Sequence, residues 1–179
     1  MAVGPRAHEL DDWVLATAPS ATAYARSLLA NAHEAEDIVQ DCYCRLIAKV
    51  GIYDLKRDGL KLLFTAIGNA CINLRTRRKP VFRLIQSDAA GEDRNEDPAD
   101  VRAVSPAEFA VGNELERAIA EGLKLLSTQQ RAAVELKALG YSQAEVAEML
   151  GTTATNAGVL VHRARQMLAQ YLKPYLAEG

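Results

Sequence analysis

The sequence predicts an all-α protein: a front helical bundle and a C-terminal helix-turn-helix domain, joined by an acidic flexible linker. Ala and Leu dominate a chain of 179 residues, whereas the Val, Ile, Thr and aromatic runs typical of strands are scarce. Apolar residues recur at helical spacing along both ends of the chain. With 49% hydrophobic residues, the chain can bury the core of one large or two small domains.

The charge distribution divides the chain into three parts. Residues 1–86 carry 12 Lys and Arg against 9 Asp and Glu, residues 87–113 carry 2 against 7, and residues 114–179 carry 7 against 7. The segment Gln86–Pro106, QSDAAGEDRNEDPADVRAVSP, covers most of the middle part and has too little apolar surface to offset the entropy of ordering. We therefore expect a front domain at 1–86, a linker at 87–113 and a rear domain at 114–179.

Helical periodicity predicts the elements of the front domain in order. Apolar spacing indicates helices over Leu10–Leu29, His33–Val50 and Leu60–Arg78, with a loop at Gly51–Gly59. Pro19 is expected to begin a new helix, because proline lacks the backbone N–H that a helix interior uses.

Four further helices are predicted from Pro106 onward. Their expected ranges are Pro106–Leu125, Thr128–Leu139, Gln143–Leu150 and Thr153–Tyr171. The last two form a helix-turn-helix, a device that places a helix end in the major groove of DNA.

The signals for this helix-turn-helix are local. Ser142 and Glu145 have the spacing of a capping box. Gly151 lies where a helix end needs a residue that tolerates the left-handed conformation, and Thr152 and Thr153 offer the next N-cap. The second helix has no Lys or Arg from Ala154 to Val161, although phosphate contacts supply much of the affinity of DNA-binding proteins.

An acidic helical face is the first candidate binding surface. Asp37, Gln40 and Asp41 lie at positions i, i+3 and i+4, so they share one face of their helix. Such a face is either solvated or a docking surface for a partner helix.

A basic run is the second candidate surface. Arg75, Arg77, Arg78 and Lys79 follow Asn69 and Asn73, and Arg83 comes soon after. Basic residues near a helix C-terminus complement the helix dipole, but this number exceeds what a cap needs. A phosphate-binding patch is the better interpretation, with the two Asn side chains available for base edges.

Other classes of function have little support. No phosphate-binding loop, catalytic triad or metal-ligand spacing is present, so we expect neither an enzyme nor a bound cofactor or metal. Cys42, Cys44 and Cys71 are interpreted as small buried hydrophobes, with a redox or metal role as the alternative. There is no apolar run of about 18 residues and no signal-peptide pattern, so we expect a cytoplasmic protein without membrane insertion.

Three blocks of sequence resemble bacterial sigma factors. HEAEDIVQDCYCRL is similar to their core-binding helix, and LLFTAIGNACINLRTRRK looks like the promoter-melting and minus-10 helix. LSTQQRAAVELKALGYSQAEVAEMLGTTATNAGVLVHRAR resembles their minus-35 domain. The order of the blocks, the acidic linker and the length resemble the small extracytoplasmic-function (ECF) members of the sigma-70 family, from about Leu10 to Leu172.

The resemblance implies a role for each candidate residue. It implies that core RNA polymerase is bound by Asp37, Gln40 and Asp41. Contact with minus-10 promoter DNA falls to Asn69, Asn73, Arg75, Arg77, Arg78 and Lys79. Contact with minus-35 DNA falls to Thr153, Thr155, Asn156, His162, Arg163 and Arg165. The loop at Gly51–Gly59 matches the place where some members hold a flipped-out base, and an anti-sigma factor is the expected regulatory partner.

The sequence departs from the family at several positions. The family usually has Lys and Arg where Gly158 and Leu160 stand, and often Arg and Asp where Gly68 and Asn73 stand. Two alternatives therefore stay open beside a promoter-directing sigma factor: a sigma mimic that titrates an anti-sigma factor, and a helix-turn-helix transcription regulator.

Overall fold

Seven α-helices make up the part of the chain that the structure describes, residues 7–78 and 114–176 of a computed structural model. The helices are α1 (Ala7–Leu28), α2 (Ala32–Ile47), α3 (Leu55–Arg78), α4 (Glu114–Lys124), α5 (Thr128–Ala138), α6 (Gln143–Met149) and α7 (Ala154–Leu176). The predicted all-α class is confirmed. The predicted linker, residues 87–113, lies outside the described residues.

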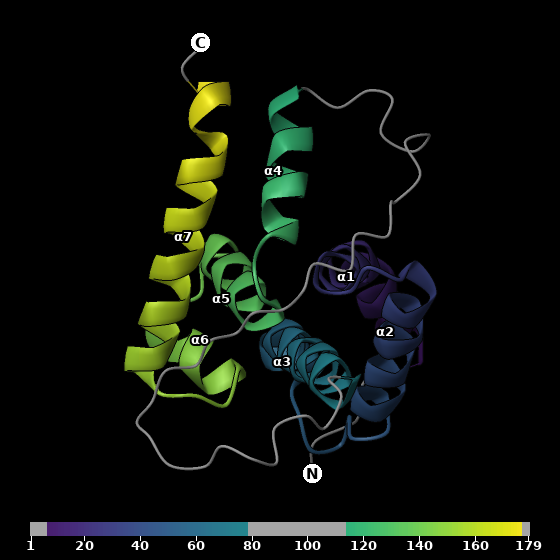
Figure 1. Ribbon diagram of the computed structural model, residues 1–179. Coiled ribbons are helices and arrows are strands. Elements are labelled where there is room, and N and C mark those ends of the chain that lie inside the picture. The colour runs from purple at the N-terminus through teal and green to yellow at the C-terminus, as the bar shows by residue number, and fades with distance from the viewer. Residues whose placement is uncertain (1–6, 79–113, 177–179) are drawn as a thin grey trace.

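The front helices α1, α2 and α3 pack on one another around a core that one aromatic pair anchors (Figure 1). Tyr24 of α1 meets Phe64 of α3 edge to face, with ring centroids 5.1 Å apart. Buried residues from all three helices fill the space around them: Ala21, Ala25, Leu28, Val39, Cys42, Leu46, Leu63, Ile67 and Cys71.

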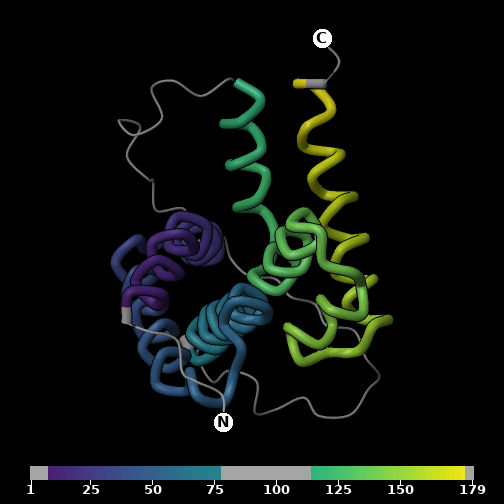
Figure 2. Tube along the Cα trace, turned by 180° about the vertical axis from the view of Figure 1, so that it is seen from behind, coloured from purple at the N-terminus to yellow at the C-terminus, as the bar shows by residue number. Residues whose placement is uncertain are grey.

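The rear helices are arranged around α7, which packs against α4, α5 and α6. In Figure 2, α4 and α7 run side by side, away from the front helices, whereas α5 and α6 lie next to α3. Gly122 lets α4 approach α7 closely, since a Cβ there would lie 3.0 Å from the ring of Tyr171. The contacts of α5 and α6 with α1 and α3 join the front and rear helices into one hydrophobic core cluster.

The structure corrects two predicted boundaries in the front helices. Pro19 does not begin a new helix but lies inside the continuous α1. The hydrogen bond that proline removes would have ended on the carbonyl of Leu15, a residue that is 73% exposed, so α1 passes through Pro19 on its solvent side, where water can reach the backbone.

The predicted loop at Gly51–Gly59 is wrong in its second half, because α3 already begins at Leu55. Asp54 supplies the cap: its Oδ1 accepts hydrogen bonds from the backbone N–H groups of Lys56 and Arg57. Gly59 is then a close-packing position, since a Cβ there would lie 3.0 Å from the ring of Trp13.

The cysteine prediction is correct for two residues and wrong for one. Cys42 and Cys71 are buried, and burial raises the pKa of both thiols, that of Cys71 to about 12. Cys44 is exposed, because it lies two residues from Cys42 and so on another face of α2.

Candidate functional site

The acidic face of α2 is fully presented to solvent. Asp37, Gln40 and Asp41 are all exposed. Asp41 also accepts a hydrogen bond from Arg45 at 3.3 Å, one turn later on the same face. The opposite face of α2 is buried in the core, through Ala35, Val39, Cys42, Tyr43 and Leu46.

The N-terminal end of α2 is capped by Asn31, whose side chain accepts from the backbone of His33 and Glu34. The cap and the buried face together fix the three polar side chains on a rigid element, which is what a docking surface requires.

The basic and amide-bearing end of α3 is less uniform than its sequence indicates. Asn73 and Arg77 are exposed, whereas Asn69 and Arg75 are half-buried. Nδ2 of Asn69 donates a hydrogen bond of 3.0 Å to the backbone carbonyl of Met149, in the rear helices. The side chain of Arg78 and the whole of Lys79 lie outside the described residues.

The helix-turn-helix has the predicted local geometry. Ser142 and Glu145 form a complete capping box at the start of α6, and Gly151 has a left-handed φ of 63°. Oγ1 of Thr153 accepts from the backbone N–H of Asn156 and so caps α7. The turn is therefore built as the sequence predicts.

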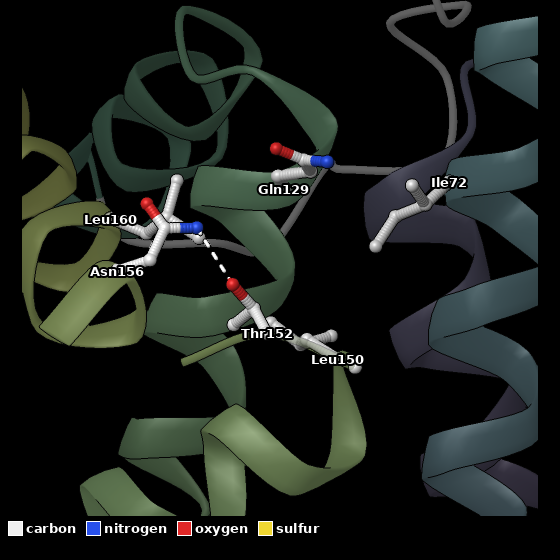
Figure 3. Close-up of a pocket in the computed structure, with 7 residues that line it drawn as sticks. Ile72, Gln129, Leu150, Thr152, Asn156 and Leu160 are labelled. Atoms are coloured by element: carbon white, nitrogen blue, oxygen red, sulfur yellow. Dashed lines mark hydrogen bonds between the residues drawn. The ribbon is translucent and has the colours of Figure 1, made fainter. Parts of the chain in front are cut away.

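The side chains at the start of α7 face solvent, where a DNA groove can reach them. Thr153, Thr155 and Asn156 are exposed, and Nδ2 of Asn156 donates a hydrogen bond of 2.8 Å to Oγ1 of Thr152 (Figure 3). The exposed residues that follow on the same helix are His162, Arg163 and Arg165.

Gly158 has a packing role that the sequence does not reveal. A Cβ at this position would lie 2.7 Å from Nε2 of Gln143, and this amide donates a hydrogen bond of 2.6 Å to the backbone carbonyl of Ala154. Gly158 thus lets the two helices of the motif approach closely, with Gln143 bridging them.

The described residues hold no group of His, Cys, Asp and Glu that could bind a metal ion. Among the described helices, none is long and apolar enough to cross a membrane.

Comparison with known proteins decides the family. The family pattern for Sigma-70 region 2 matches residues 13–81, and that for Sigma-70 region 4 matches residues 116–168. The chain is 30% identical over 169 residues to the ECF RNA polymerase sigma factor EcfG of Rhodopseudomonas palustris (strain TIE-1), covering 94% of this chain and 87% of the relative. This chain belongs to the ECF sigma factors.

Two further similarities agree with this assignment. This sigma factor is 27% identical over 149 residues to the ECF RNA polymerase sigma factor SigW of Bacillus subtilis (strain 168), covering 82% of this chain and 79% of the relative. A solved structure of the sigma factor RpoE in complex with the anti-sigma factor NepR from Bartonella quintana matches with a TM-score of 0.65 and 25% identity. That match covers 92% of this chain and 97% of the other.

Several polar residues that join the front and rear helices were missed at the level of sequence. Oγ of Ser27 donates a hydrogen bond of 2.6 Å to Oε2 of Glu135, and Lys61 forms an ion pair of 2.8 Å with Glu148. The guanidinium of Arg131 donates to the backbone carbonyl of Ser27. These partners are far apart in sequence, so no local pattern could have found them.

Proposed function

We propose that this ECF sigma factor recruits core RNA polymerase through the acidic face of α2 and directs it to promoters through α3 and the start of α7. The observation that carries the proposal is that exposed polar residues lie on three packed helices: Asp37, Gln40 and Asp41 on α2, Asn73 and Arg77 on α3, and Thr155 and Asn156 on α7. One surface is acidic and suits a protein partner, one is basic, and one is the presented end of a helix-turn-helix.

The acidic face supports the polymerase role. The exposed side chains of Asp37, Gln40 and Asp41 lie on one face of a capped, well-packed helix. Among the described residues, the surface pair of Asp41 with Arg45 is their one side-chain hydrogen bond or ion pair. A surface ion pair of this kind contributes less than about 1 kcal/mol, so a partner can replace it at little cost.

The two DNA surfaces support promoter recognition. Asn73, Arg75 and Arg77 combine amide groups for base edges with charge for phosphates, and the same role is proposed for Asn69, Arg78 and Lys79. In the rear helices, Thr153, Thr155 and Asn156 lead the helix that would enter the major groove, with His162, Arg163 and Arg165 further along.

We propose that the front domain (1–86), linker (87–113) and rear domain (114–179) act as tethered modules. A weak DNA contact by the neutral start of α7 suffices when the front domain is already bound to polymerase, because tethering raises the effective concentration of the second contact. An anti-sigma factor is the proposed regulatory partner, and the bacterial cytoplasm is the proposed site of action.

Run-off transcription tests the proposal. Purified sigma factor added to core RNA polymerase should yield specific transcripts from genomic DNA fragments, and polymerase alone should yield none. The neutral start of α7 favours one second candidate, a mimic that binds polymerase or an anti-sigma factor without reading promoters. Core binding with no specific transcript from any fragment would favour that candidate and refute ours.

A further inference from the structure

The surface that the first turns of α7 present to solvent carries methyl groups and one amide instead of positive charge. The buried side of this helix is formed by Ala157 and Ala164. Val159 lies on the other side and is 39% exposed. Thr155 and Asn156 precede Val159 by four and three positions and are exposed as well, so the three side chains form one continuous surface. We call these three residues the recognition face.

Val159 is an unfavourable residue for an exposed helical position. A β-branched side chain loses χ1 freedom against the preceding turn of a helix, so valine forms helices less readily than alanine does. At 39% exposure, Val159 also gives up part of the stabilisation that burial of an apolar side chain provides. A contact outside the chain would use this side chain. In the major groove of DNA, the apolar group that a protein side chain meets is the C5-methyl group of thymine.

The amide of Asn156 is held by a residue one turn earlier. Its Nδ2 donates a hydrogen bond of 2.8 Å to Oγ1 of Thr152, and Figure 3 shows its Oδ1 on the side of the amide that faces away from Thr152. The bond to Thr152 uses one of the two N–H groups of the amide, which leaves a second donor beside the carbonyl acceptor. One donor beside one acceptor is the pattern that pairs with N7 and N6 of adenine.

Both features fit the same kind of base pair. An A·T pair presents the N7 acceptor and N6 donor of adenine and the methyl group of thymine in the major groove, whereas guanine presents two acceptors that Arg or Lys bind. The helix α7 has no Lys or Arg before Arg163. Side chains three positions apart on a helix lie about 5–6 Å from each other, so Asn156 and Val159 can reach neighbouring base pairs.

We propose that the recognition face of this chain is specific for A·T pairs. The amide of Asn156 binds an adenine, and Val159 contacts the methyl group of a neighbouring thymine. Thr152 is a positioning residue, which acts on the adenine only through the orientation of the Asn156 amide. This inference rests on the proposed function, because it names the bases that the start of α7 reads.

A selection of DNA duplexes identifies the bases that are read. The full chain is combined with core RNA polymerase, and duplexes of random sequence that bind to the complex are recovered and sequenced. We expect an enriched upstream element that contains neighbouring A·T pairs. The duplex with this element is then synthesised for the binding measurements that follow.

Changes of single groups in the selected duplex test each contact. Deoxyuridine in place of the thymine removes only the methyl group, and it should weaken binding of the wild type about 3-fold. The analogue 7-deazaadenine removes only the N7 acceptor, and it should weaken binding of the wild type about 10-fold. Val159→Ala should bind the thymine and deoxyuridine duplexes equally well, while it keeps the full response to 7-deazaadenine.

Two variants of Thr152 test its positioning role. Thr152→Val keeps the shape of the side chain but removes the hydroxyl, so Asn156 loses its partner and the response to 7-deazaadenine should shrink from about 10-fold to about 3-fold. Thr152→Ser keeps the hydroxyl and should keep the full response. Both variants should respond to deoxyuridine as the wild type does, because Val159 is unchanged. A purely structural role of Thr152 would instead alter both responses together.

Met167→Ala is the matched control for Val159→Ala. Met167 is an apolar residue of the same helix with a similar exposure, 37%, and it lies about 12 Å further along the helix axis. This variant should respond to both base analogues as the wild type does.

Three results would overturn the inference: a selected element whose upstream pairs are G·C, a selection without any preferred upstream base, or a Val159→Ala variant that still responds to deoxyuridine. Run-off transcription by the wild type reports on the proposed function separately. Specific transcripts together with any of these three results would leave the proposed function in place and remove the A·T specificity of the recognition face.

Discussion

The side-chain amide of Asn69 donates a hydrogen bond of 3.0 Å to the backbone carbonyl of Met149, and this contact joins the proposed minus-10 helix to the helix-turn-helix. The carbonyl belongs to the last residue of α6, where a helix leaves carbonyl groups without partners inside the helix. Asn69 satisfies one of them, so a residue proposed to read DNA also serves as a C-terminal cap for α6.

The acidic face of α2 gives the first prediction. The double variant Asp37→Lys/Asp41→Lys should lose binding to core RNA polymerase, because the charge of the proposed docking surface is reversed. Its helical content and unfolding midpoint should stay close to those of the wild type, since only the surface pair with Arg45 is lost. Co-purification with core polymerase measures the binding.

The matched control for this variant is Glu114→Lys/Glu116→Lys, which makes the same change of charge at two exposed positions of α4. This control should still bind polymerase. If the α2 variant bound as well as the wild type, the docking role of the acidic face would be refuted.

The second prediction concerns Gly158 and takes account of its close contact with Gln143. Any side chain at position 158 must displace Nε2 of Gln143, so Gln143→Ala is used as the background. In that background, Gly158→Lys should strengthen DNA binding and steepen its dependence on log salt by about one, because one more phosphate contact releases one more counterion.

The control for Gly158→Lys is Gly158→Gln in the same background, which adds a side chain without charge. Titration with a DNA duplex at several salt concentrations measures both slopes. Equal slopes for the Lys and Gln variants would mean that position 158 does not face phosphate.

Tyr24 and Gly68 give the third prediction. A Cβ on Gly68 would lie 3.0 Å from the hydroxyl oxygen of Tyr24, so Gly68→Ala should destabilise the protein by about 1 kcal/mol, the cost of overpacking exceeding the gain in helix propensity. In a Tyr24→Phe background that contact is gone, and Gly68→Ala should become stabilising by up to about 1 kcal/mol.

Urea unfolding of the four proteins in this cycle measures the coupling between Tyr24 and Gly68. Tyr24→Phe alone should be close to neutral, because the hydroxyl that it removes is buried without a hydrogen-bond partner among the described residues. An equal effect of Gly68→Ala in both backgrounds would show that Tyr24 does not limit the size of residue 68.

The elements that the sequence predicted well are those with local causes. The capping box of Ser142 and Glu145 and the left-handed Gly151 depend on residues within a few positions of one another, and both are confirmed. The missed start of α3 also had a local signal, since Asp54 is an N-cap residue type. The continuity of α1 through Pro19 had no local signal in the sequence, because it depends on which side of the helix faces water.

The contact between the front and rear helices could not be predicted, because its causes are not local. Ser27 and Glu135 are separated by 108 positions, and the sequence around each of them is that of an ordinary amphipathic helix. Gly68 and Leu160 are instructive, since both stand where the family more often has Arg. The structure gives these positions a packing role beside Leu150 that a comparison of charges alone does not suggest.

Glu135 gives the last prediction, a dependence of the stability of the fold on pH. Burial raises the pKa of this carboxyl to about 7, while the hydrogen bond from Ser27 and the charge of Arg131 act in the opposite direction. Tyr24, on α1, interacts with the same carboxyl, and burial raises the pKa of its hydroxyl. The neighbouring groups Cys71 and Tyr141 also raise the pKa of Tyr24. Burial raises the pKa of Cys71 and of Tyr141 themselves, so neither of these two groups is charged near neutral pH.

The sign of the effect follows from this raised pKa. Below the ordinary pKa of a glutamate, the carboxyl is neutral in both the folded and the unfolded chain. As the pH rises toward 7, it ionises in the unfolded chain first, so the folded chain loses stability over this range and the loss levels off above about pH 7. Between pH 5.5 and 7.5 the free energy of unfolding of the wild type should therefore fall by about 2 kcal/mol more than that of a variant without this carboxyl.

Urea unfolding at pH 5.5, 6.5 and 7.5 measures this loss. Glu135→Gln keeps the shape of the side chain and an oxygen that can accept from Ser27, but it does not titrate, so it should be more stable than the wild type at pH 7.5 and lose less stability as the pH rises. Glu121→Gln, at an exposed position of α4, should behave as the wild type. A loss of the same size in Glu135→Gln would assign the pH dependence to another group.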